Sequence, residues 1–347
     1  MTIRQIFCTV ADLIADMEKP GGDEARLYDA IKTACNELQK EFGIGWFIPV
    51  TQTTKLRGSG EKWFYPNPPV LSLTGSILND TDTLVENTDY VFMRRSWDDG
   101  PYIGVEALAD GNLSTWRDTD PDSVQIPCRA GLYERSEDTE ANVADASGQT
   151  SSQPTLKVSN GGRVSPGMVL KIENEQQLVT GWGDPTTNVT TINMASGLTA
   201  TDTELTVADA SLVNVGEIIR LEFAQSRVAD RRTSANKLLL VRGWNNTQSK
   251  AHANATQVDV YRTVNVERAI NGTTAAAHAL NTDIYRYLPP PDVNFLVRQI
   301  ATLMINKARG NYAGKSASAD GETVFYHDVF PRYEIERIKQ NYWVMMA

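Results

Sequence analysis

The stretch RGWNNTQSKAHANATQV at residues 242–258 recurs without a gap as RAINGTTAAAHALNTDI at residues 268–284. Identical residues lie at the same positions of both copies: Arg242 and Arg268, Asn245 and Asn271, Thr247 and Thr273, His252 and His278. A copied unit indicates architecture rather than catalysis, because an active site seldom needs two identical copies side by side. We therefore predict that Thr247, His252, Thr273 and His278 are structural residues that hydrogen-bond the turns between strands, although a metal or sugar site between the copies stays an alternative.

A second repeat lies upstream, where residues 164–173 match residues 213–222. The match places Gly167 against Gly216 and Glu173 against Glu222, with apolar residues between them. Thr, Val, Asn and Gly dominate residues 150–285, and no helical period persists there, which is typical of short strands joined by tight turns. The sequence predicts two to three related β modules, inserted at residues 154–287.

Size and composition exclude several classes of protein. The chain has 347 residues, enough for two or three domains with a sizeable core. No apolar run is long enough to span a membrane, and the first residues lack the apolar segment of a signal peptide. Cys8, Cys35 and Cys128 are far apart in the sequence. We therefore expect neither a disulfide framework nor a zinc site, and assembly in a reducing cytoplasm.

Negative charge is concentrated in one region. The net charge is −10, and residues 79–145 contain sixteen Asp and Glu against five Arg. A chain of this kind lacks the basic surface of a nucleic-acid-binding protein. Two interpretations stay open: a solvated face that keeps the protein soluble, or a surface that stays close to DNA without adhering to it.

Amphipathic patterns predict helices near both ends of the chain, with strands between them. Asp23 is a predicted N-cap for a helix at 23–43, and a shorter helix at 10–17 precedes it. Two more helices are predicted at 291–308 and about 329–342. The predicted order is N-terminal helices (1–45), a β subdomain (46–133), a polar linker (134–153), the β modules (154–287) and C-terminal helices (288–347).

Parts of this pattern resemble the head–tail connector proteins of tailed bacteriophages, also called adaptor or head completion proteins. The matching features are the early helix before Phe47-Ile48-Pro49, the strand led by Pro68-Pro69-Val70-Leu71-Ser72, the Asp89-Tyr90 strand start and the closing helices. Residues 267–278 are also similar to sequences in phage structural proteins. The likeness covers about 1–133 and 288–347. The chain is long for an adaptor, and residues 150–285 are alternatively part of a tail or decoration protein.

The resemblance implies an α+β fold, in which N- and C-terminal helices form an adaptor-like helical bundle with a β subdomain and an inserted all-β repeat region. It further implies a virion neck protein, assembled in the host cytoplasm, that forms a homo-oligomeric ring. That ring is a dodecamer in the family, docks on the portal protein, continues the DNA ejection channel and receives a downstream neck or tail-terminator protein. DNA would pass without sequence-specific binding.

The last helix holds the residues expected to contact a partner: Ile335, Ile338, Tyr342 and Trp343. The alternative is a terminal helix that folds back on its own core.

No motif in the sequence predicts catalysis, a cofactor or a metal ion. A P-loop, a Gly-x-Ser-x-Gly elbow and a His-Glu-x-x-His pair are all missing. His327 beside Asp328 is interpreted as a surface pair. The aspartates within residues 118–122 have the spacing of the first three ligand positions of an EF-hand loop, but Ser123 and Arg129 replace its glycine and its last glutamate. We therefore expect no enzyme activity.

Two other functional classes stay open. The β modules are alternatively a host-surface or carbohydrate-binding structure, with Trp182 and Trp244 as stacking platforms. A glycosidase carboxylate pair within residues 79–145 is the third alternative, but no flanking aromatic cleft is evident there.

Overall fold

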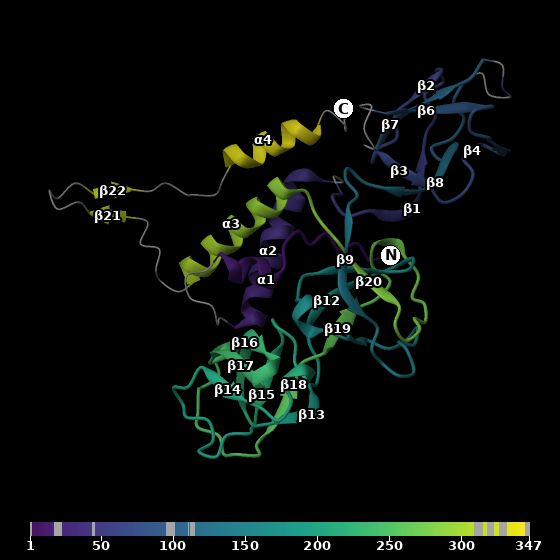
Figure 1. The fold of residues 1–347 in the computed structure, drawn as a ribbon. Coiled ribbons are helices and arrows are strands. Elements are labelled where there is room, and N and C mark those ends of the chain that lie inside the picture. Colours follow the sequence, from purple (N-terminus) through teal and green to yellow (C-terminus); the bar gives the residue numbers. More distant parts are fainter. Residues whose placement is uncertain are drawn as a thin grey trace.

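The computed structural model describes residues 2–16, 23–43, 46–94, 101–109, 111, 115–308, 315–317, 323–325 and 332–343. Within these ranges the helices are α1 (Val10–Ala15), α2 (Glu24–Phe42), α3 (Pro291–Ala308) and α4 (Arg332–Trp343). Figure 1 shows the helices side by side in one layer, with a β subdomain at one end of this layer and two β units below the helices. Two short strands, β21 (Lys315–Ala317) and β22 (Thr323–Phe325), pair only with each other.

The predicted fold class, a helical adaptor bundle with β additions, is wrong. The protein is mostly β, with 36% strand, 23% helix and three large sheets. The predicted helices exist, but their apolar faces do not pack only on one another. Val169, Ile218 and Trp244, which come from the β units, belong to the same buried core as Leu27, Ile31 and Leu38 of α2. The helices are therefore one layer over β units.

The first β unit is a closed six-stranded barrel. Its strands are β9 (Ser136–Asn142), β10 (Thr155–Lys157), β11 (Val169–Ile172), β12 (Glu175–Trp182), β19 (Thr263–Glu267) and β20 (Asp283–Tyr287), in the order β10-β19-β12-β11-β20-β9. A bridge between Val143 and Val158 joins the two edges of this sheet. Closure pairs the edge strands, which otherwise expose unsatisfied backbone groups. We call this unit the first barrel.

The predicted linker at 134–153 is also wrong in part, because it contains β9. Along this strand, exposed polar residues alternate with the buried Thr139 and Ala141. A strand on a barrel surface needs few apolar residues, so its sequence is easily taken for a linker.

The second unit, which we call the inserted barrel, has one counterpart for each strand of the first barrel. It contains β13 (Thr186–Thr191), β14 (Glu204–Thr206), β15 (Ile218–Leu221), β16 (Ala224–Arg232), β17 (Lys237–Arg242) and β18 (Gln257–Val260), in the order β13-β18-β15-β16-β17-β14. A bridge between Ile192 and Val207 closes it. The order matches that of the first barrel when each strand is replaced by its repeat counterpart. The β region therefore contains two modules, which is the lower number in the predicted range of two to three.

The two barrels are nested rather than consecutive. The inserted barrel lies in the chain between β12 and β19, which are neighbouring antiparallel strands of the first barrel. The ends of the insertion are consequently close together, which is the geometry that accommodates a whole domain within a hairpin. Figure 1 shows the inserted barrel at the far end of the molecule from the β subdomain.

Equivalent turns of the two barrels require glycine for the same reason. Gly148 and Gly197 both have positive φ, 73° and 70°. A Cβ at either residue would lie 2.4 Å from the carbonyl oxygen of His278 or His252, respectively. Only glycine avoids this clash and adopts the left-handed conformation without strain.

The helical layer is formed by segments near both ends of the chain, and the described chain ends within it, at the end of α4. Thr9 caps α1 in a capping box with Asp12, and Asp23 caps α2 as predicted. Residues before α1 run along the first barrel, where the amide of Asn271 donates to Thr2 O (2.8 Å) and the amide of Val10 donates to Pro166 O (2.9 Å). No helix in the described ranges is both long and apolar enough to span a membrane.

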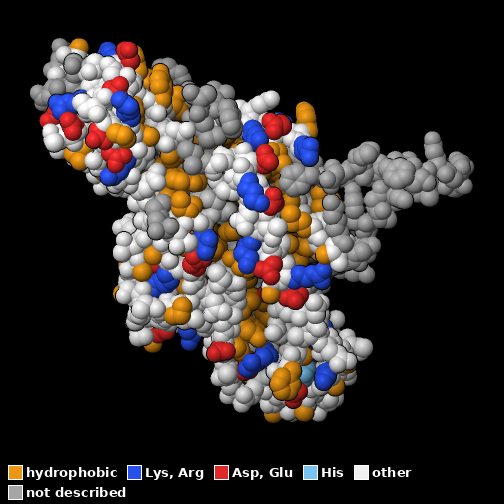
Figure 2. Space-filling view, turned by 180° about the vertical axis from the view of Figure 1, so that it is seen from behind, with side chains coloured by type: hydrophobic (Ala, Val, Ile, Leu, Met, Phe, Trp, Pro, Cys, Tyr) orange, Lys and Arg blue, Asp and Glu red, His pale blue; other side chains and the backbone are white. Residues whose placement is uncertain are grey.

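The β subdomain has its own core, around Trp116 and Tyr90. Its sheet contains β1 (Val50–Leu56), β2 (Trp63–Phe64), β3 (Val70–Leu73), β4 (Leu78–Asn79), β5 (Asp82–Thr83), β6 (Tyr90–Arg94), β7 (Tyr102–Ala107) and β8 (Val124–Ala130). Five acidic residues in the described part of this unit are ion-paired. Arg117 contacts Asp80 and Asp82, while Arg57, Lys55 and Lys62 contact Asp118, Asp122 and Glu106. Figure 2 shows both charge signs interspersed on this unit.

Candidate functional site

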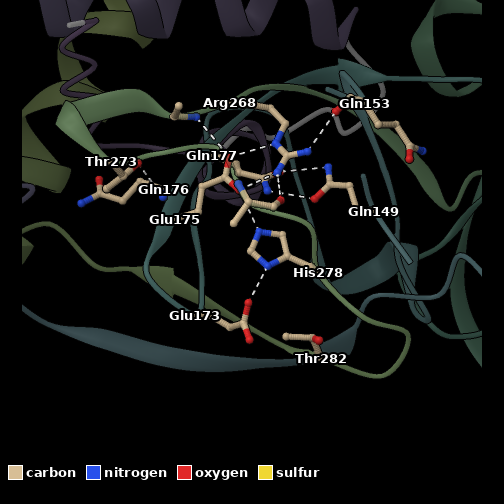
Figure 3. A network of polar contacts seen from close by, with 12 residues as sticks. Gln149, Gln153, Glu173, Glu175, Gln176, Gln177, Arg268, Thr273, His278 and Thr282 are labelled. Atoms are coloured by element: carbon tan, nitrogen blue, oxygen red, sulfur yellow. Dashed lines mark hydrogen bonds and ion pairs between the residues drawn. The ribbon is translucent and has the colours of Figure 1, made fainter. Parts of the chain in front are cut away.

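A dense polar cluster lies inside the first barrel, around Glu175 at the start of β12. Figure 3 shows Arg268 and His278 converging on this carboxylate from the chain that follows β19. Arg268 donates from Nε (2.8 Å) and Nη2 (2.5 Å), and His278 Nε2 lies 2.8 Å from Glu175 Oε2. The amides of Ala269 and Ala276 donate to the same carboxylate, both at 3.2 Å. Glu175 therefore joins β12 to the long connection between β19 and β20.

Burial and charge act against each other at this cluster. The side chains of Glu175 and His278 are 0% exposed. Burial by itself would raise the pKa of Glu175, but hydrogen bonds from His278 and Arg268 outweigh it and lower the pKa to about 2. Burial would likewise lower the pKa of His278, but Glu175 and Glu173 outweigh it and raise that pKa. The contacts therefore favour the imidazolium form of His278 and the carboxylate form of Glu175.

This arrangement is suited to holding the barrel together rather than to acid–base catalysis. His278 Nδ1 lies 2.8 Å from Glu173 Oε2, so carboxylates occupy both ring nitrogens. A general base needs one free nitrogen and a reacting group within hydrogen-bond reach. No serine, threonine or cysteine side chain hydrogen-bonds to this histidine in the described chain. His278 is therefore an ion-pair residue.

The inserted barrel contains a reduced copy of the cluster. Arg242 and His252 occupy the positions of Arg268 and His278, and His252 Nδ1 lies 3.3 Å from Glu222 Oε2. The position of Glu175, however, is taken by Ala224. As a result Arg242 Nε and His252 Nε2 are buried without a hydrogen-bond partner among the described residues. Burial lowers the pKa of His252, although Glu222 opposes this shift.

Two repeated threonines hydrogen-bond equivalent turns. Thr247 Oγ1 donates to Trp244 O (2.8 Å) and accepts from the amide of Gln225 (2.9 Å). Thr273 Oγ1 donates to Ile270 O (2.8 Å) and accepts from the amide of Gln176 (3.0 Å). Each threonine thus ties a turn to the neighbouring strand of its own barrel.

A second buried carboxylate connects the helical layer to both barrels. Glu24, in the first turn of α2, accepts hydrogen bonds from Trp182 Nε1 (2.6 Å) and Trp244 Nε1 (3.1 Å). Trp182 ends β12 of the first barrel, and Trp244 follows β17 of the inserted barrel. Burial raises the pKa of Glu24, against the opposing effect of these indole donors. Glu24 therefore fixes where the two barrels meet the helix.

A cleft of about 610 Å³ opens between the two barrels beside this junction. Its lining includes Trp182, Tyr261, Arg220 and Asp184. The rings of Trp182 and Tyr261 meet edge to face, with centroids 6.2 Å apart. Trp244, the other predicted stacking platform, is buried in the core beneath and offers no face to a ligand.

The residues predicted to contact a partner lie elsewhere and mostly face inward. Ile335 and Ile338 are buried in the protein's own core. Tyr342 packs on Phe47, with ring centroids 5.0 Å apart, and its hydroxyl lies 3.3 Å from Asp292 Oδ1. The partner-contact interpretation is therefore corrected for Ile335 and Ile338, because they are buried in the protein's own core, whereas Tyr342 is partly buried. The side chain of Trp343 and residues 327–328 lie outside the described part of the chain.

The aspartates of the loop that resembles an EF-hand make contacts within the protein. Asp118 pairs with Arg57, Asp122 pairs with Lys55, and Asp120 accepts from the amide of Asp122. No group of three or more His, Cys, Asp or Glu in the described chain is arranged to hold a metal ion.

Sequence reasoning found the repeated histidines but missed Glu175, Ala224 and Glu24. The signal for the first two was present, since the second repeat, continued by two residues, aligns Glu175 with Ala224. Nothing local distinguishes Glu24 from any acidic residue in the first turn of a helix.

Comparison of the chain with protein-family models, with curated proteins and with solved structures finds no match.

Proposed function

We propose that the protein is a structural component of a tailed-phage virion that assembles into a ring between the portal and the tail. A structural role is supported by the buried polar groups of the protein, which bind to one another. Glu175 and Glu24 each join separate segments of the chain, and their hydrogen bonds are made within the protein. The more specific place, at the portal–tail junction, is supported by the resemblance of the sequence to connector proteins.

The helical layer is the surface we propose for contact between subunits. Closed barrels offer few free strand edges, so pairing of strands between subunits is disfavoured there. The helices present large apolar side chains to solvent, as the inserted barrel also does at Phe223, which is 92% exposed. Phe295 on α3 is 50% exposed and Tyr333 on α4 is 76% exposed. Burying aromatic side chains of this size is a common source of binding energy at protein interfaces.

The charge distribution is compatible with passage of DNA through a ring. The net charge is −10, and positive side chains of the β subdomain are paired with carboxylates. DNA adheres to proteins mainly through unpaired Lys and Arg that displace counterions from its phosphates. A surface of paired charges therefore gives weak contact, which sliding DNA requires.

The test is direct imaging of assembly. The full chain, alone and mixed with the portal protein of the same virus, is examined by electron microscopy and sedimentation velocity. We expect rings, or rings docked on the portal. The double variant Phe295→Ser, Tyr333→Ser should assemble less while melting at the same temperature. Tyr65→Ser, a matched change on the β subdomain at a side chain that is 64% exposed, should leave assembly intact. A chain that stays monomeric with both portal and tail proteins contradicts the proposal.

A second candidate function, carbohydrate binding, is favoured by the cleft between the barrels. An aromatic ring beside charged and amide side chains is the usual composition of a sugar site, and Trp182, Arg220 and Asn265 all line this cleft. Glycan-array binding by the full chain that is lost in Trp182→Ala would support it. If the full chain binds no glycan on the array, the carbohydrate-binding function is contradicted.

A further inference from the structure

The two barrels differ at one buried position that changes the chemistry of the inserted barrel. In the first barrel, Arg268 and His278 meet the carboxylate of Glu175. In the inserted barrel, Ala224 stands at the equivalent position and supplies no acceptor. Arg242 Nε, His252 Nε2 and Ser226 Oγ are each buried and have no hydrogen-bond partner in the described chain. Buried polar atoms without partners are rare and costly, so three together indicate a ligand.

The guanidinium of Arg242 is oriented for an anion even though the carboxylate is missing. Its Nη1 donates to Thr199 O and Asp202 O, and its Nη2 donates to Lys250 O. Arg268 makes the equivalent contacts with Thr150 O, Gln153 O and Ala276 O. Because the same three contacts fix both guanidinium groups, the Nε of Arg242 points to the place that corresponds to the carboxylate of Glu175.

The size of that place is defined by the substitution itself. A glutamate side chain exceeds alanine by one methylene and one carboxylate, which are the heavy atoms of an acetate ion. The neighbouring Gln177 is also replaced by a smaller residue, Ser226, and Gln149 is replaced by Leu198. Leu198 is buried and forms a β-bridge with His252, so its apolar side chain replaces the amide of Gln149 there. The space therefore suits a small carboxylate with a hydrogen or methyl group.

We propose that the inserted barrel binds a one- or two-carbon carboxylate ion, such as formate or acetate, between Arg242 and His252. His252 Nδ1 faces Glu222, so a carboxylate at Nε2 requires both ring nitrogens to carry protons. Binding therefore takes up one proton at His252. The charged groups around the ring are Glu222, which favours this proton, and Arg242 and Lys250, which oppose it. Affinity consequently rises as the pH falls toward the ordinary range of histidine.

The experiment is a titration of the full chain with sodium acetate and sodium formate against sodium chloride at equal ionic strength. The melting temperature should rise with acetate and formate at about pH 6, and less at about pH 8. The NMR signal of the His252 ring should shift in the same titration, with an increase in its pKa. This site is independent of ring assembly, so it is tested whether or not the protein binds a portal.

Two variants at one position provide the controls. Ala224→Glu supplies the carboxylate from the chain, so we expect a higher pKa of His252 and loss of the acetate response. Ala224→Gln fills the same space without charge, and acetate affinity should fall by about tenfold or more with no rise in that pKa. If the wild-type protein responds to acetate no more than to chloride at pH 6, or if Ala224→Glu keeps the full response, the proposal is wrong. The wild-type arm decides the matter even if a variant does not fold.

Discussion

Replacing Glu175 by alanine should destabilise the first barrel by about 3–5 kcal/mol at pH 7, because it breaks a buried ion pair, leaving Arg268 without its anion and His278 with only the exposed Glu173. The structure gives the magnitude by a second route. The pKa of Glu175 is lowered from 4.5 to about 2, and a shift of this size at a fully buried carboxylate corresponds to about 3 kcal/mol. We expect the lower end of the range, because the inserted barrel folds with alanine at the same position.

Urea unfolding followed by circular dichroism and tryptophan fluorescence measures this loss. A carboxylate with a lowered pKa stabilises the folded state above its unfolded pKa, and that stability is lost as the pH falls through the folded pKa. The difference between wild type and Glu175→Ala should therefore narrow progressively from about pH 5 to about pH 2.

Glu173→Gln is the matched control for Glu175→Ala. It removes the other carboxylate that contacts His278, but this side chain is 59% exposed. We expect its cost to stay below about 1 kcal/mol, because solvent screens an exposed pair. If Glu175→Ala costs no more than this control at pH 7, the ion network does not stabilise the barrel and the reasoning fails.

Three further predictions concern other buried groups. Burial raises the pKa of Glu24, so ionisation of this side chain should lower the stability of the folded protein as the pH rises above the ordinary carboxyl pKa. The urea midpoint of Glu24→Gln should therefore change less between about pH 5 and about pH 7 than the urea midpoint of the wild type. The NMR titration of the His278 ring should be centred above pH 6.5, and that of the His252 ring below pH 6.5. The stability that His278 contributes is therefore lost as the pH rises through its pKa, whereas the stability that His252 contributes is lost as the pH falls from 6.5. The reverse order of the two titrations would contradict both environments. Ile338→Ala should lower the free energy of unfolding by about 2–5 kcal/mol, because Ile338 is only 1% exposed; an unchanged melting temperature would show that α4 is not part of the core.

The repeats illustrate how far pattern alone reaches. The buried residues of β11 and β15 are apolar and occupy the same positions in both strands, so this match was visible in the sequence. The apolar stripe of α2 and its Asp23 cap were visible for the same reason, since both depend on neighbours within a few residues. Local periodicity does not reveal what each face packs against, and for this reason the helices were wrongly assigned to a bundle of their own.

By itself the sequence determined that a β unit is repeated, two to three times, that helices lie near both ends, and that two histidines share equivalent positions. The tertiary structure decided that one barrel lies inside a hairpin of the other, and which charges are buried. Glu175 and Arg268 are 93 positions apart, and Glu24 and Trp244 are 220 apart. A carboxylate looks the same in a sequence whether water or an arginine surrounds it. Only the closure of the barrels and their docking on α2 remove the water and turn ordinary acidic residues into buried ion-pair and hydrogen-bond partners.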